Sequence, residues 1–122
     1  MKIYRIENEE TNHGMWYRLD GTFDPFINRL TDGRSKDLPM GFNERYFTGG
    51  QRWQSGAGSI EDMRHWFSEL DALELHQNGY KLYQMETSQF IVVEHEIMFT
   101  REGIASRQEI PLNVVWDMKN IL

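Results

Sequence analysis

The stretch from Ser59 to Gly79 constrains this chain most, because it predicts where a helix begins and where it ends. Ser59 can accept a hydrogen bond from the free amides of a first helical turn, and Asp62 three residues later approximates a capping box. Asn78 and Gly79 supply the left-handed residue at which helices commonly terminate. The sequence therefore predicts one main capped helix over residues 59–78.

Apolar residues recur along this helix at spacings of three and four, which places them on one face. They are Ile60, Met63, Phe67, Leu70 and Leu73, with Trp66 beside them. The opposite face carries Glu61, Arg64, His65, Ser68 and Asp71. Together with Asp62, Glu69 and Glu74, these residues form an acidic outer face. We expect the apolar face to pack on a sheet and the acidic face to meet solvent or a basic partner.

The rest of the chain favours an α+β fold with a small, mainly antiparallel sheet and an irregular N-terminal third. Strands are predicted at Lys2–Ile6, at Tyr80–Glu86, at Phe90–Val93 as a buried strand, and at His95–Thr100 beside it. Residues 107–112 could form a last strand, and Leu112, Val115 and Trp116 could equally belong to a short terminal helix. Met15–Tyr17 resembles a strand. The insert Gly21–Gly50 is loop-rich, with a short helix predicted at Pro25–Leu30 that Asp24 could cap.

Composition indicates one domain, residues 1–122, with a core rich in large side chains. The chain is 39% hydrophobic and 13% aromatic, with four Trp and seven Phe, which exceeds what disordered segments carry. It has no cysteine, so disulfides, thiolate metal sites and a cysteine nucleophile are excluded. Four histidines without metal-ligand spacing favour no metal site.

The charge balance disfavours nucleic acid as a partner. The formal net charge is -6, whereas phosphate-backbone binding depends on clustered Lys and Arg. No apolar run is long enough for a signal peptide or a membrane span, so we expect no membrane partner. An acidic surface of this kind could instead meet a basic groove on another protein.

Two local patterns could carry chemistry. The glycine-rich run from Gly49 to Gly56 contains Arg52 and Trp53, which could clamp and stack a nucleotide, but a turn leading into the helix is the favoured explanation of the run. Glu94 and Glu96 lie two apart, so on a strand they share a face and could act as a carboxylate pair. The simpler expectation is that this face meets solvent.

Three segments resemble a family of small bacteriophage and prophage proteins over about two-thirds of the chain. They are the opening KIYRIEN, the capped segment SIEDMRHWF with its Leu-rich remainder ending in NGY, and the strand pair KLYQMET and EHEIMF. The chain departs from that family by Ala57-Gly58 in place of Gly-Phe before the cap, and by Glu96 where Gln is common. The resemblance implies a phage-encoded protein.

The order of elements resembles, more remotely, the ADP-ribosyltransferase fold. That resemblance implies that Arg5 on the first strand holds NAD and that Tyr46 or Thr48 supplies a hydroxyl. Glu94 or Glu96 would then stabilise the oxocarbenium-like centre formed as nicotinamide leaves. The Ser-Thr-Ser run of such enzymes is missing from the chain.

We therefore expect a non-enzymatic phage accessory protein that acts in the host cytoplasm by binding a host protein, and that inhibits a defence or metabolic enzyme without a cofactor. Candidate contact residues are Arg52, Trp53, Glu61, Asp62, Glu69 and Asp71. The alternative is a small ADP-ribosyltransferase or NAD-binding protein that uses Arg5, Thr48, Glu94 and Glu96. A second alternative is a virion or assembly component that self-associates through Trp16, Trp53 or Trp116.

Overall fold

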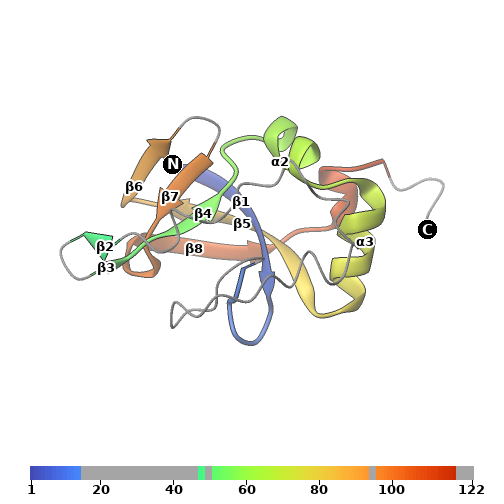
Figure 1. Cartoon of the computed structure of the whole chain (residues 1–122), viewed down its shortest axis with the longest axis horizontal. Coiled ribbons are helices and arrows are strands. Elements are labelled where there is room, and N and C mark those ends of the chain that lie inside the picture. The colour runs from blue at the N-terminus through green and yellow to red at the C-terminus, as the bar shows by residue number, and fades with distance from the viewer. Residues whose placement is uncertain (15–46, 49–50, 94–95, 118–122) are drawn as a thin grey trace.

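The computed structural model describes residues 1–14, 47–48, 51–93 and 96–117, which combine helices and antiparallel strands (Figure 1) and confirm the α+β class. The strands are β1 (Lys2–Asn8), β2 (Phe47–Thr48), β3 (Gln51–Arg52), β4 (Gln54–Gly56), β5 (Tyr80–Thr87), β6 (Phe90–Val93), β7 (Glu96–Phe99) and β8 (Ile104–Glu109). The helices are α2 (Ile60–Trp66) and α3 (Glu69–Gln77), and the 3-10 helices are η2 (Arg101–Gly103) and η3 (Leu112–Val114). The elements predicted at Met15–Tyr17 and Pro25–Leu30, and most of the insert, lie outside the described residues.

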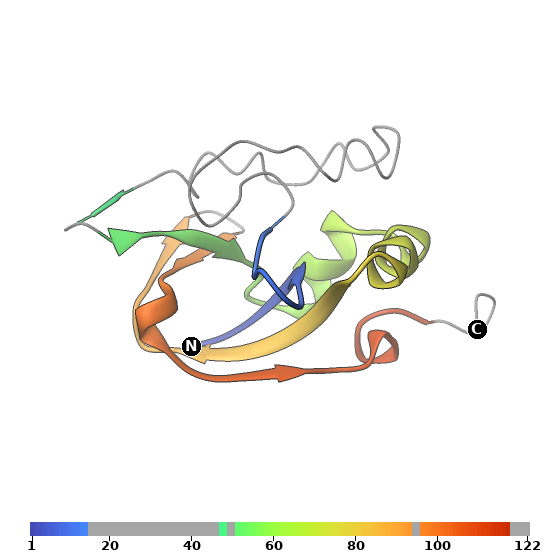
Figure 2. The ribbon, with the colours of Figure 1, turned by 90° about the horizontal axis from the view of Figure 1, so that it is seen from below.

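Two three-stranded antiparallel sheets share one edge. Their strand orders are β1-β5-β8 and β4-β7-β6, and β2 and β3 form a separate hairpin. Tyr4 and Ala57 exchange both backbone hydrogen bonds, at 2.8 and 2.7 Å, which joins β1 to the chain just after β4. The six strands therefore follow one another around a curled surface. In Figures 1 and 2 the helices lie at one end of this surface and β6 and β7 lie at the other.

Strand β1 is buried on both faces because a separate core cluster covers each of them. Tyr4 and Ile6 pack with the helices and the C-terminal segment around Leu75 and Val115. Ile3 points the other way, toward a second cluster formed by Tyr83, Met85, Ile97 and Phe99. Alternation along the strand places Arg5 and Glu7 on this second face. Two charged side chains therefore enter the interior of the curled sheet.

The helix predicted over residues 59–78 is two helices. Its ends are confirmed: the Asp62 amide donates to Ser59 Oγ at 3.1 Å, and Gly79 has a φ of 86°. In between, Phe67 is extended and Ser68 starts α3 with a complete capping box, since the Asp71 amide donates to Ser68 Oγ at 3.1 Å. The Ser68 side chain thus offers the backbone a partner that competes with a continuous helix.

This break changes which residues α3 buries. Leu70, predicted on the apolar face, is exposed, and Asp71, predicted on the acidic outer face, is buried. Ala72 and Leu75 provide the buried contacts of α3 instead. The prediction is confirmed for Phe67 and Leu73, which pack in or against the core, and is wrong for Leu70 and Asp71, because a second helix starts at Ser68.

Three strand predictions are confirmed, at β1, β5 and β7. The C-terminal strand, predicted over residues 107–112, lies earlier, at Ile104–Glu109, and η3 follows it, so the C-terminal segment contains both a strand and a short helix. Strand β6 was predicted to be buried, but Phe90, Ile91 and Val92 are exposed because β6 lies at the edge of its sheet. The glycine-rich run was predicted to be a turn, yet Gln54–Gly56 forms β4.

Candidate functional site

The enzyme hypothesis needs Arg5 and Glu96 to face one another, and the structure places them on different faces of β7. The Arg5 guanidinium carbon lies 5.7 Å from the centre of the Phe99 ring. Glu96 stands three residues before Phe99 on a regular strand, so it shares the opposite face with Met98. Glu96 is buried, which corrects the expectation of a solvent face at that position.

The structure describes no side chain for the other predicted catalytic residues, Thr48, Tyr46 and Glu94. Thr48 pairs with Gln51 in the β2–β3 hairpin, and only its backbone is described. Tyr46 and Glu94 lie outside the described residues. Their roles remain predictions.

Of the predicted contact residues, three acids remain accessible on the helices. Glu61 is exposed, and Asp62 and Glu69 are partly buried. Asp71 is buried and completes the capping box of α3, so it does not belong to an exposed acidic face. The side chain of Arg52 is not described.

Of the three tryptophans proposed for self-association, the two that the structure describes offer little surface. Trp53 and Trp116 are both buried, which contradicts their predicted exposure, and Trp16 lies outside the described residues. Trp116 Nε1 donates to the carbonyl oxygen of Phe67 at 2.8 Å. Trp53 Nε1 is buried and donates to no acceptor in the described part of the chain.

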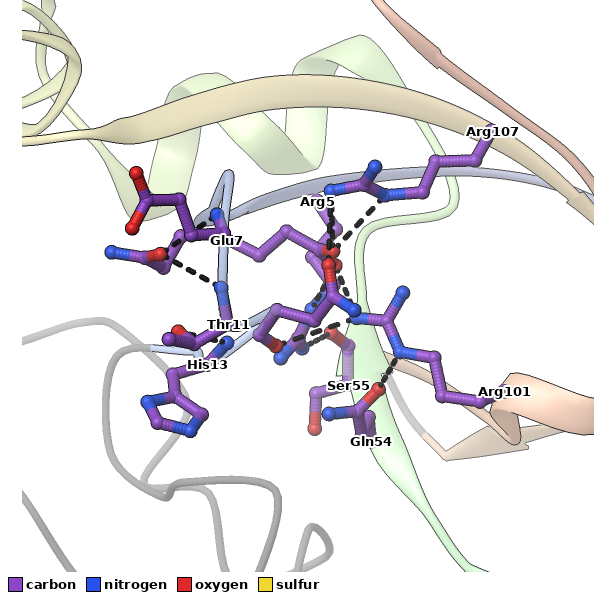
Figure 3. A network of polar contacts seen from close by, with 11 residues as sticks. Arg5, Glu7, Thr11, His13, Gln54, Ser55, Arg101 and Arg107 are labelled. Carbon is purple, nitrogen blue, oxygen red and sulfur yellow. Dashed lines mark hydrogen bonds and ion pairs between the residues drawn. The ribbon is translucent and has the colours of Figure 1, made fainter.

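The most concentrated polar site is a cluster of three arginines around the fully buried carboxylate of Glu7 (Figure 3). Arg5 Nε donates to Glu7 Oε1 at 3.0 Å, and Arg101 Nη2 donates to the same oxygen at 2.5 Å. Arg107 Nε donates to Glu7 Oε2 at 3.2 Å. We call these four residues the Glu7 cluster.

Three elements of the fold carry the Glu7 cluster, and a fourth supports it. Arg5 and Glu7 share one face of β1, Arg101 opens η2 after β7, and Arg107 lies on β8. Gln54 on β4 accepts from Arg101 Nε at 2.7 Å. The cluster thus links both three-stranded sheets, which explains why the curled surface holds its shape on this side.

Neutral groups and rings complete the surroundings of the cluster. The Asn12 side-chain oxygen accepts from Arg107 Nη2 at 3.0 Å, and the Ser55 carbonyl oxygen accepts from Arg5 Nη1. Arg101 lies 5.8 Å from the centre of the Phe99 ring, and Arg107 lies 3.7 Å from the centre of the Tyr83 ring. Such cation–π contacts favour guanidinium groups that are partly removed from water.

The surroundings of the cluster shift the pKa values of Arg101 and Tyr83. Burial lowers the pKa of Arg101; Glu7 opposes this shift, while Arg5 and Arg107 add to it. Burial also raises the pKa of Tyr83, which the neighbouring Arg107 partly offsets. The shift at Arg101 reflects its burial with several positive charges drawn together around one negative charge, whereas the shift at Tyr83 reflects its burial, to which Glu109 and Glu7 add.

One feature of the sequence, the placement of two charged residues on one face of the first strand, could have pointed to this site. In the strand KIYRIEN, Arg5 and Glu7 occupy the same face as Ile3. Charged residues at alternate positions of a strand usually indicate a solvent face. Here the second sheet covers that face, so only the tertiary arrangement reveals the cluster.

A second notable surface is the edge strand β6. Phe90, Ile91 and Val92 are 41%, 40% and 59% exposed, and among the described strands β6 has β7 as its only neighbour. Natural proteins commonly cover or charge such edges, because the unpaired backbone can recruit another chain. Strand β6 has neither a charge nor a proline over these three residues.

The described part of the chain offers neither a metal-binding cluster nor a membrane-spanning helix. It holds no group of three or more His, Cys, Asp or Glu side chains that could bind a metal ion. None of its helices is long and apolar enough to cross a membrane.

Comparison with known proteins places the chain in a phage family. No curated protein and no solved structure matches it, and the resemblance to ADP-ribosyltransferases gains no support. Residues 1–113 match the family described as Bacteriophage T4 Y00F protein, which confirms the resemblance to small phage proteins. Because that match spans nearly all of the 122 residues, the chain belongs to the Bacteriophage T4 Y00F protein family and is a phage-encoded accessory protein.

Proposed function

We propose that this accessory protein acts without catalysis by binding a host protein, and that β6 forms the contact. The observation that carries the proposal is the exposure of Phe90, Ile91 and Val92 on an edge strand. Three consecutive apolar residues at an edge combine two attractive features for a partner: apolar surface to bury and backbone groups that can extend the sheet.

An extended segment of the partner fits β6 best. A strand added beside β6 would pair with its backbone, while apolar side chains at alternate positions would cover Phe90 and Val92 on one face and Ile91 on the other. The backbone bonds provide affinity and the side-chain contacts provide selectivity. The partner segment should therefore be apolar and β-branched where it meets β6.

The acidic charge of the chain favours a partner with a basic surface around that segment. The net charge is -6, and Glu61, Glu102 and Glu109 are exposed. Charge complementarity of this kind speeds association and favours correct partners more than it adds affinity. The helix acids Glu61, Asp62 and Glu69 form a second candidate contact with such a partner.

The test is capture from host lysate with the tagged full chain, comparing Val92→Lys with Ser106→Lys. Both variants add one lysine to an exposed edge-strand position, but Ser106 lies on β8 of the other sheet. We expect a stoichiometric partner with the unmodified chain and with Ser106→Lys, and its loss with Val92→Lys. Retention of the partner by Val92→Lys would contradict the role of β6.

An NAD-consumption assay on the same preparations tests the enzyme alternative. We expect no turnover. Turnover that disappears in Glu96→Ala, together with no stoichiometric partner, would overturn the proposal and restore NAD as a substrate.

A further inference from the structure

Two arginines of the Glu7 cluster hold unused hydrogen-bond donors near the surface. The side chains of Arg101 and Arg107 are 24% and 30% exposed, whereas Glu7 is fully buried. Each arginine uses its Nε and Nη2 atoms in hydrogen bonds within the cluster. Nη1 of each donates to no residue that the structure describes, and in Figure 3 both Nη1 atoms are turned away from Glu7.

The same carboxylate holds these two arginines side by side. Arg101 Nη2 lies 2.5 Å from Glu7 Oε1, and Arg107 Nη2 lies 3.1 Å from Glu7 Oε2. Gln54 fixes the Nε atom of Arg101, and the Tyr83 ring supports the guanidinium plane of Arg107. Both guanidinium groups are therefore held in position before any ligand arrives, which reduces the entropy lost on binding.

Their positive charge is only partly compensated. Within the described residues, Glu7 is the one carboxylate that pairs with Arg101 or Arg107, and it also accepts from Arg5. Glu109, two residues from Arg107 on β8, forms no ion pair with either arginine. Gln54 and Asn12, the other side chains that accept from these two arginines, are neutral.

We propose that Arg101 and Arg107 bind the phosphate group of a small phosphate monoester, through their Nη1 atoms, at the exposed side of the Glu7 cluster. A phosphate dianion matches an excess of positive charge better than a carboxylate. It also presents three oxygens that can accept from two separate guanidinium groups. A nucleic acid is a poor fit, because the acidic chain would repel an extended phosphate backbone. This site is independent of β6 and adds a small-molecule ligand to the proposed protein contact.

Titration of the full chain with inorganic phosphate at constant ionic strength tests the proposal. Nuclear magnetic resonance of the arginine Nε–H groups reports on each guanidinium directly. We expect saturable shifts at Arg101 and Arg107, and an affinity at least about tenfold weaker in Arg107→Gln, since a charge-assisted hydrogen bond is lost. Lys2→Gln, which removes the same charge from an exposed position on β1, should change the affinity less than about twofold.

Titration with acetate and a second arginine variant complete the experiment. Acetate should bind at least about tenfold more weakly than phosphate if the dianion is the preferred ligand. Arg107→Lys keeps the charge but loses the forked donor, and circular dichroism establishes whether each variant is folded. If Arg107→Gln does not fold, Arg107→Lys is expected to show the weakened binding. Equal phosphate affinity in the folded arginine variants and in Lys2→Gln, or acetate binding as tightly as phosphate, would overturn the proposal.

Discussion

Replacing Glu7 by Gln should destabilise the protein far more than its small chemical change suggests. The side chain keeps its shape, but the negative charge that Arg5, Arg101 and Arg107 share is lost. The three guanidinium groups would then repel one another around a fully buried side chain, although Arg101 and Arg107 are 24% and 30% exposed to solvent. A glutamine oxygen can still accept hydrogen bonds, but the Glu7→Gln side-chain amide also places a donor against these cations.

The expected loss follows from the cost of breaking a buried ion pair. Removing one partner of such a pair typically costs about 3–5 kcal/mol. For a chain of this length, an unfolding entropy of about 2.1 cal/mol/K per residue converts that loss into a fall in melting temperature of about 12–20 °C. Total stabilities of small domains are about 5–15 kcal/mol, so the variant unfolds substantially at room temperature only if the parent lies near the bottom of that range.

Urea unfolding followed by tryptophan fluorescence measures this loss, because Trp66 and Trp116 are buried in the folded protein. Glu86→Gln is the matched control: its side chain is 48% exposed on β5, and its one ion pair is with the N-terminus at 3.7 Å. We expect the control to change the free energy of unfolding by less than about 0.5 kcal/mol. A loss below about 1 kcal/mol in Glu7→Gln would contradict the role of this buried carboxylate in compensating the three arginines around it.

Three further perturbations test separate parts of the fold. Gly103→Ala should lower the free energy of unfolding in urea by about 1–3 kcal/mol, because the added Cβ would lie 2.7 Å from the Gln89 Cβ atom. An unchanged urea midpoint would contradict this contact. Ser68→Ala should lower the free energy of unfolding by about 1 kcal/mol, because the capping box of α3 is lost. The control Ser106→Ala, at an exposed position, should lower it by less than about 0.5 kcal/mol, and equal effects would argue against the break between the helices. Burial raises the pKa of Tyr83 above its ordinary value of 10.0, so its contribution to stability is fully present below about pH 10 and is lost as the pH rises through the folded-state pKa. Tyr83→Phe should therefore flatten the decline of stability above pH 10, and an unchanged pH profile would exclude this cause.

The helical stretch shows what local sequence can and cannot predict. Ser59 and Gly79 fixed the outer ends of the helical region, because capping and left-handed termination depend on neighbouring residues alone. The break at Phe67 was missed, although Ser68 and Asp71 have the spacing of a cap. The apolar residues continue at helical spacing across this point, and the prediction followed that spacing rather than the cap.

The site could not be predicted because its parts come from distant segments. Arg101 and Arg107 lie about a hundred positions from Glu7. Nothing in the spacing of residues in a single sequence reveals that a side chain of β1 contacts side chains of η2 and β8. The edge position of β6 was equally hidden, since a run of apolar β-branched residues predicts a strand without saying how many neighbours it has.

Hydrogen exchange of the purified complex shows directly whether a partner strand pairs with β6. The captured host protein is bound to the full chain, and amide exchange is compared with that of the free chain, segment by segment. We expect slowed exchange to be concentrated at Phe90–Val93, because those backbone groups gain partners when a strand is added. Protection confined to α2 and α3, with exchange at β6 unchanged, would contradict it and would place the contact on the helix acids.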